Sequence, residues 1–281
     1  MTRRRPYLLA GPALAMLVLL LAGPLGLLVR VSLYEPAAGR GFFQPGTWSS
    51  RAYRELLADD SFREIAAFTV LAGLGITALT LLIAYPLALF IHGLGGRAKL
   101  VAVGAVLLPK LCNMLVLVYG LQLVLSGSGP VSLALVGLGL SREPVLLYRN
   151  LGGMVVGETY LLLPYAVLLI LVGLARVDPT LVAAARGLGA GPWRAFWRVT
   201  WPLALPGLLA AGQLTLLWAL AAVLGPLLLG GPQELTLGVE VQRQALEYHR
   251  WPRAAAVAVL LMLTLMAALI LTGTTRRAVN S

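Results

Sequence analysis

Six long apolar runs, separated by polar segments, constrain what this chain can fold into more than any other feature of its sequence. A helix needs about 20 mostly apolar residues to cross a bilayer, and each run has about that length. The sequence therefore predicts an all-α, polytopic membrane protein with about six transmembrane helices. The expected spans are about Tyr7–Leu33, Ile65–His92, Leu100–Leu125, Leu151–Leu174, Leu203–Leu224 and Ala254–Thr272.

The composition favours a single transmembrane domain over residues 1–281. Hydrophobic residues make up 59% of the chain and charged residues only 12%, which is far from the composition of a soluble domain. Six spans and the loops between them account for the 281 residues, so no soluble catalytic domain is expected. The N-terminal apolar run is longer than the hydrophobic region of a signal peptide, and we expect it to be retained as the first span.

The distribution of arginine and lysine predicts the orientation in the membrane. The N-terminal side carries eleven basic residues against one acid, Asp178, whereas the opposite side carries ten arginines against nine acids. The positive-inside rule then places both termini in the cytoplasm. The outer loops are expected at about 34–64, 126–150 and 225–253. The net charge of +11 is spread over these loops and not over one patch, so nucleic acid is not an expected partner.

Motifs for enzymatic chemistry are absent from the sequence. It contains no G-x-x-x-x-G-K-[ST] phosphate loop, and its two lysines, Lys99 and Lys110, follow no glycine-rich turn. His92 and His249 fall in loops on opposite faces of the membrane, so no cluster with metal-ligand spacing is expected. Ser128 has no histidine within a span that could act as its base. The chain is therefore predicted to be no enzyme and to hold no metal or cofactor.

Two ionisable residues, Lys110 and Glu158, fall deep inside predicted spans. A charge at that depth costs at least about 2.5–3.5 kcal/mol, so both side chains should face the bundle interior or a water-filled cavity. They are candidates for a solute pathway, and a static ion pair that fixes helix packing is the alternative. Asn113, three residues from Lys110 on the same predicted helical face, and Gln213 in the fifth span are weaker candidates for the pathway.

A polar, arginine-bearing segment, Asp178–Gly207, lies between the fourth and fifth apolar runs. Asp178 and Pro179 are typical of a helix start, and Gly187 and Gly189 are expected to end that helix. A second helix is expected from about Pro192. It would carry Trp193, Phe196, Trp197 and Trp201 on one face and Arg194 and Arg198 on the other. The pattern predicts a cytoplasmic docking element, or else an interfacial helix that lies on lipid headgroups.

The sequence LVAAARGLGAGPWRAFWRVTWPLALPG resembles the cytoplasmic EAA loop of ABC importer permeases, with the approximate pattern E-A-A-x-x-x-G and a closing L-P. Ala183, Ala184 and Ala185 stand in the E-A-A places, Gly189 in the glycine place, and Val199–Pro202 near the closing end. LSGSGPVSLALVGLGL and AAVLGPLLLGGPQELTLGVEVQRQALEYHRWPRAAA resemble further segments of the spermidine/putrescine-type permeases. The likeness covers about Pro109–Ala258.

The resemblance implies a MetI-like fold and one of two membrane subunits of an ABC importer. The implied partners are a second permease, two ABC ATPase subunits that carry ATP and Mg, and an extracytoplasmic solute-binding protein. The implied cargo is a small organic solute, either polyamine-like, amino-phosphonate or opine-like. An ion-coupled secondary transporter or channel that uses Glu158 and Lys110 is the alternative function. The coupling loop would span about 175–202 and include Ala183, Ala184, Ala185, Arg186, Gly187, Gly189, Pro192, Trp193 and Arg194.

One position departs from the family pattern. Ala183 stands where the family has glutamate, so the carboxylate that usually helps to anchor this loop in the ATPase groove is missing. In the family, such permeases often work as unlike pairs. The departure therefore predicts a companion permease that keeps the glutamate, with Arg186 as an alternative polar contact in this chain.

Overall fold

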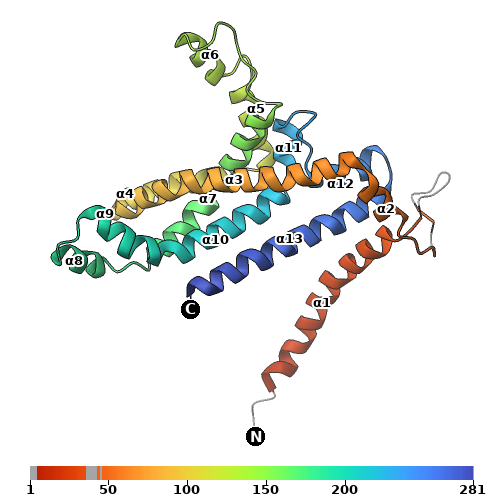
Figure 1. The fold of residues 1–281 in the computed structure, drawn as a ribbon, viewed down its shortest axis with the longest axis horizontal. Helices are drawn as coiled ribbons and strands as arrows, with labels where there is room; N and C mark the ends of the chain where they lie inside the picture. Colours follow the sequence, from red (N-terminus) through yellow and green to blue (C-terminus); the bar gives the residue numbers. More distant parts are fainter. Residues whose placement is uncertain (1–4, 36–42, 45, 281) are drawn as a thin grey trace. The chain divides into compact units, whose positions relative to one another are not determined.

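The computed structural model describes residues 5–35, 43–44 and 46–280, which fold mainly into helices (Figure 1). Six helical stretches in this part of the chain are long and apolar enough to cross a membrane, which confirms the predicted all-α, six-span class. They are Ala15–Ser32, Asp60–Gly93, Met114–Gly137, Leu151–Leu174, Pro192–Leu220 and Trp251–Gly273. The chain forms two compact units, with boundaries at residues 64/65, 239/240 and 263/264.

The larger unit, which holds residues 65–239 and 264–281, is built around α7 (Leu151–Leu174) and α10 (Trp201–Leu220). These two helices lie side by side (Figure 1). Glycines bring their backbones together, because a Cβ built on Gly173 would be only 2.7 Å from Cα of Gly207. Small residues at a contact between spans permit such close packing. The core that includes α3 (Asp60–Gly93) contains Ala84, Ala88, Ile91, Ala166, Val167, Ile170, Leu174, Ala204 and Ala211.

The predicted third span is not one helix, and this expectation was wrong. α4 (Gly96–Leu107) passes into a short 3₁₀ turn, η1 (Leu108–Leu111), and a new helix, α5 (Met114–Leu125), follows. Pro109 cannot donate to the helix ladder and its ring crowds the preceding turn, so the α-helix ends there. Cys112 is extended, and the side chain of Asn113 accepts a hydrogen bond from the Leu115 amide at 2.8 Å. Asn113 is thus a helix cap and does not share a helical face with Lys110.

The fifth span begins earlier and ends earlier than predicted. Helical structure runs without a loop from α9 (Pro192–Ala195) through the π-helical turn η2 (Phe196–Thr200) into α10, so Pro202 and Pro206 lie within the helical run. A proline removes one hydrogen bond to the residue four positions earlier, and a widened turn before Pro202 accommodates that loss. The helix ends at Leu220, not Leu224. The helical segment Pro192–Thr200 is therefore continuous with α10, with no loop between them.

The predicted outer loops contain further helices. The segment 126–150 holds α6 (Pro130–Gly137), and 225–253 holds most of α11 (Leu224–Leu229), α12 (Leu237–Gln242) and the π-helical turn η3 (Arg243–Glu247). α11 is apolar and is no surface loop, because Leu229 is buried with Val118 of α5 and Leu161 of α7. Hydrogen bonds to its backbone from Gln122 (2.5 Å) and Arg149 (2.7 Å) hold it in place.

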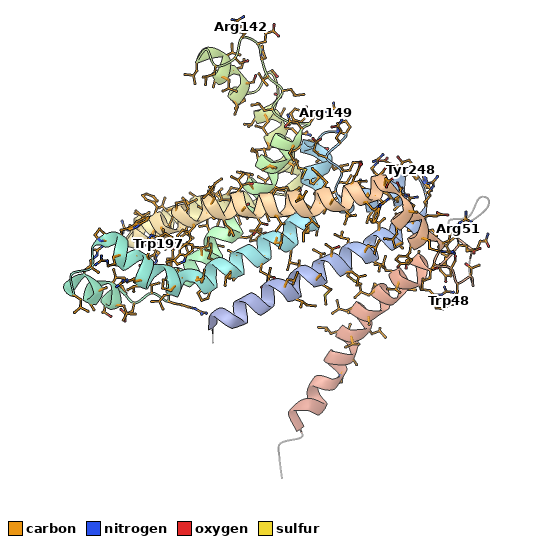
Figure 2. All side chains as sticks on the ribbon, viewed as in Figure 1. Trp48, Arg51, Arg142, Arg149, Trp197 and Tyr248 are labelled. Atoms are coloured by element: carbon orange, nitrogen blue, oxygen red, sulfur yellow. The ribbon has the colours of Figure 1, made fainter. Side chains whose placement is uncertain are left out.

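The smaller unit contains α1 (Arg5–Ser32), α2 (Arg51–Ala58) and the first half of α13 (Trp251–Asn280). Arg30, at the end of α1, lies between two aromatic rings, 4.2 Å from the Tyr34 centroid and 3.9 Å from that of Trp48. Ser32 and Tyr53 share a hydrogen bond of 2.7 Å. The labelled Trp48, Arg51 and Tyr248 in Figure 2 all belong to this unit.

An ion pair joins two distant segments of the smaller unit. Arg253, in the first turn of α13, donates to Asp59 between α2 and α3 at 2.5 Å, and this bond holds the pKa of Asp59 below its ordinary value. A carboxylate with a lowered folded-state pKa stabilises the fold above its unfolded pKa of about 3.9. That stabilisation is lost as the pH falls through the lower, folded-state pKa.

We therefore expect Arg253→Met to lower the Tm of the detergent-purified protein at pH 7. The difference from the unchanged protein should shrink as the pH is lowered below about 4, because Asp59 is then protonated in the unfolded state and the stabilisation from its lowered folded-state pKa declines. Tm is measured at pH 7, 5, 4 and 3. Arg51→Met is the matched control, because its pair with Glu55 is exposed on a single helix and should contribute little. A difference that stays constant down to pH 3 would contradict the ion pair.

Candidate functional site: an exposed helical module and a broken span

An exposed two-helix module connects α7 to α10. Its first helix, α8 (Pro179–Gly187), begins where predicted, because Asp178 accepts a hydrogen bond from the Thr180 amide at 2.8 Å and Pro179 occupies the first turn. That bond holds the pKa of Asp178 below its ordinary value. Gly189 has a φ of +87°, a backbone conformation that favours glycine, and turns the chain into α9. The predicted helix, glycine turn and second helix are therefore confirmed.

Aromatic side chains connect this module to the membrane helices. Ring centroids are 5.4 Å apart for Phe196 and Trp197, 5.1 Å for Trp197 and Trp201, and 5.2 Å for Trp201 and Tyr85 of α3. Each such pair contributes about 0.5–1.5 kcal/mol beyond its buried area. The helical segment after Gly191 is thus packed against α3 through aromatic rings and is continuous with α10 through the backbone.

The outer surface of the module is free in this chain. Leu188 is 90% exposed and Trp193 71% exposed. A groove of about 290 Å³ lies between the two helices, and both Arg194 and Arg198 line it. Neither arginine takes part in a salt bridge within the described residues. Figure 2 shows Trp197 near one end of the larger unit, whereas Arg142 and Arg149 lie toward the other end.

The sequence-predicted coupling residues all lie on this module. Ala183, Ala184, Ala185, Arg186 and Gly187 are in α8, Gly189 is in the turn, and Pro192, Trp193 and Arg194 are in α9. Ala183 is exposed, so a glutamate there would face a partner in relatives that have one. The interfacial alternative on lipid headgroups stays a prediction, because Trp193 and the two arginines suit either environment.

Glu158 lies in α7 with no exposed surface, and neither carboxyl oxygen has a hydrogen-bond partner among the described residues. The backbone of Gly225, in α11, lies directly against it: a Cβ built on Gly225 would be 2.1 Å from Oε1. Sequence reasoning identified Glu158 but missed Gly225. No local pattern in the sequence indicated that the backbone of a residue 67 positions later packs against the Glu158 carboxyl group.

Lys110 lies on the break in the third span. Its Nζ is 4.4 Å from the ring centroid of Tyr165, and the Tyr165 ring is 5.3 Å from that of Trp218. Trp218 and Gln213 line a cavity of about 820 Å³, to which Met114 at the start of α5 also contributes. Lys110 and Glu158 form no salt bridge within 4 Å, so the predicted pair makes no direct ion pair, although the two groups are close enough to interact electrostatically. Sequence reasoning missed Tyr165 and Trp218. Their positions deep within apolar spans could have marked them as neighbours of a pathway residue.

These features define a class of protein: a six-span helical membrane protein with an exposed helical module between its fourth and fifth spans. Solved structures share the fold. The permease chain of a bacterial alginate ABC transporter, solved in complex with an alginate pentasaccharide-bound periplasmic protein, matches 98% of this chain and 95% of its own with a TM-score of 0.76 at 17% identity. No protein-family model matches the chain.

Curated relatives identify the family. The spermidine/putrescine transport system permease protein PotB of Haemophilus influenzae is 32% identical over 183 residues, which cover 65% of this chain and 64% of that protein. The molybdenum transport system permease protein ModB of Mycobacterium bovis is 31% identical over 203 residues, which cover 70% of this chain and 72% of that protein. The chain belongs to the membrane permease subunits of ABC importers.

Proposed function

We propose that this chain is one of two permease subunits of a bacterial inner-membrane ABC importer, with both termini in the cytoplasm. A second permease, two ABC ATPase subunits and an extracytoplasmic binding protein would complete the transporter, and the ATPases would hold ATP and Mg. The observation that carries this proposal is the exposed α8–α9 module, which is built from the segment that resembles the EAA loop. The family membership favours it over the ion-coupled alternative.

The module has the mechanical properties of a coupling element. Four residues, 175–178, connect it to α7, and on the other side its helix continues into α10 without a loop. α7 and α10 are in turn locked together where Gly173 meets Gly207. A shift of a few ångströms imposed on α8 by closing ATPase subunits would therefore move the α7–α10 pair as a rigid body.

The contact with the ATPase has to form without the glutamate that the family has at Ala183. Arg186 on α8 and the groove lined by Arg194 and Arg198 present basic groups instead. An acidic side chain on the ATPase would pair with them. An unlike companion permease that keeps the glutamate would complete an asymmetric transporter.

The proposed cargo is a small organic solute. The similarity to PotB supports a polyamine-like solute. The similarity to ModB, a molybdenum permease, is at nearly the same sequence identity and points to a different cargo. Sequence identity alone therefore does not decide which solute this chain transports. The amino-phosphonate and opine-like solutes that the sequence resemblance implies stay proposals beside polyamines. The pathway residues proposed from the sequence are Lys110, Asn113, Glu158 and Gln213, with Asn113 now limited to capping α5.

The decisive experiment is affinity purification of the tagged chain from its native membrane in mild detergent. We expect a second permease and an ABC ATPase to co-purify, and ATP to drive solute uptake when the complex is reconstituted. A chain that purifies alone and accumulates solute in response to an ion gradient would overturn the proposal.

Replacement of Gly189 tests the coupling role of the module. Because its φ is +87°, a β-branched side chain is strained there although a Cβ would meet no neighbour. We expect Gly189→Val to reduce ATP-driven uptake by about tenfold or more while the complex still assembles, because the turn that sets the α8–α9 angle is lost. Gly104→Val in α4, outside the coupling loop, is the control and should transport normally, because Gly104 is also in open space but has no positive φ. Normal uptake by Gly189→Val would refute the coupling account.

A further inference from the structure

The break between α4 and α5 places a basic group beside the middle of α7. Most of the break is exposed in this chain, and only Pro109 and Lys110 are partly buried. The Lys110 ammonium lies over the ring of Tyr165, in the middle part of α7. Lys110 is therefore level with the middle of an apolar span.

The accessible charge in this region is positive. Acidic residues of the described spans other than Glu158 lie near span ends, and Glu158 is fully enclosed behind Gly225. Lys110 is only half-buried, forms no salt bridge within the described residues, and is held by a cation–π contact of about 0.5–2 kcal/mol. A contact of that size is weak enough to be exchanged for a full ion pair.

A cavity of suitable size is reached from Lys110 through two aromatic side chains, because Lys110 contacts Tyr165 and Tyr165 contacts Trp218, which lines the cavity. Its volume is about 820 Å³, and the Tyr165–Trp218 contact connects Lys110 to its wall. The first residue of α5, Met114, also lines it, and α5 is a 12-residue helix whose positive end faces the break. Broken helices of transporters direct such ends at anionic groups of their substrates. The rest of the wall is apolar, apart from Gln213.

We infer that Lys110 is the anchor for an anionic group, a phosphonate or a carboxylate, on the transported solute. This inference rests on the proposed importer function and selects the amino-phosphonate and opine-like solutes over the polyamines. The anion would draw the ammonium away from Tyr165 and pair with it, while the remainder of the solute occupies the cavity. A polyamine would instead meet a like charge at Lys110 and find no exposed carboxylate in the middle of the described spans, because Glu158 is enclosed and the exposed Asp60 and Glu64 lie in the first two turns of α3.

Uptake by the complete transporter, reconstituted with its partners in proteoliposomes, tests the inference. The probes are radiolabelled 2-aminoethylphosphonate, octopine and putrescine. We expect uptake of at least one anionic probe to exceed that of putrescine. Lys110→Met should raise the KM for that probe by about tenfold or more, and Lys110→Arg should restore most of the affinity because it keeps the charge. Lys99→Met, which changes the other lysine of the chain, should leave uptake unchanged.

Three results would overturn the inference: preferred uptake of putrescine, an unchanged KM in Lys110→Met, or no uptake of either anionic probe by a complex that hydrolyses ATP. Failure of the proposed function is distinguishable, because it would appear as the absence of a co-purifying ATPase or as uptake without ATP. A Tm of Lys110→Met equal to that of the unchanged complex shows that a loss of uptake does not reflect misfolding.

Discussion

Gly207→Ala is expected to separate α7 from α10 and to reduce ATP-driven uptake by about tenfold or more. A Cβ on Gly207 would lie 2.6 Å from Cα and 2.9 Å from the amide nitrogen of Gly173, and 2.9 Å from the Leu169 carbonyl oxygen. All three atoms belong to backbone, so no side chain can rotate away and the helices must move apart. Overpacking of this kind costs about 1–3 kcal/mol, and close contact between spans is itself a main source of their association.

A matched control lies on the same helix. Gly212→Ala introduces the same methyl group into α10, but its nearest neighbour is the end of the flexible Leu81 side chain at 3.3 Å. We expect Gly212→Ala to keep both Tm and uptake near those of the unchanged protein, whereas Gly207→Ala lowers both. Tm is measured on the detergent-purified chain, which needs no knowledge of the solute. Equal Tm values for the two variants would show that the Gly173–Gly207 contact does not hold the helices together.

The parts of the fold that depend on local sequence were predictable. The limits of α7 agree with the predicted span, because an apolar run of bilayer length follows Asn150, whose side chain caps the helix. The start and end of α8 were predictable for the same reason, since Asp178, Pro179 and the glycines act within a few residues. These signals also located the exposed module that is proposed to couple to the ATPase.

The parts that depend on contacts between distant segments were not predictable. Average hydropathy over Leu100–Leu125 conceals the break at Pro109, because the apolar run continues across it. α11 was assigned to a polar outer loop, although it packs between α5 and α7 through Leu229. The partners of the pathway residues were missed for the same physical reason. Tyr165 lies under Lys110, and Gly225 against Glu158, only because helices far apart in sequence pack together.

Gly225→Ala is expected to impair the protein strongly through one identified clash. The new methyl carbon would lie 2.1 Å from Oε1 and 2.8 Å from Cδ of Glu158. The Glu158 side chain is fully buried, so it has no free space in which to adopt another rotamer. Either α11 moves outward or the carboxyl group is displaced within a packed core, and each costs about 1–3 kcal/mol or more. A lower Tm and a loss of uptake should therefore accompany this single methyl group.

The clash can be separated from other effects of the substitution by a double-mutant cycle. Glu158→Ala removes the carboxyl group and leaves room for the methyl group that Gly225→Ala adds, so the variant with both substitutions should have a higher Tm than Gly225→Ala alone. The expected coupling free energy is about 1–3 kcal/mol in favour of the double variant. Uptake provides a second readout. If the double variant recovers Tm but not uptake, the carboxyl group of Glu158 has a role in transport beyond packing. If the two substitutions are additive in Tm, Glu158 and Gly225 are not in contact as described.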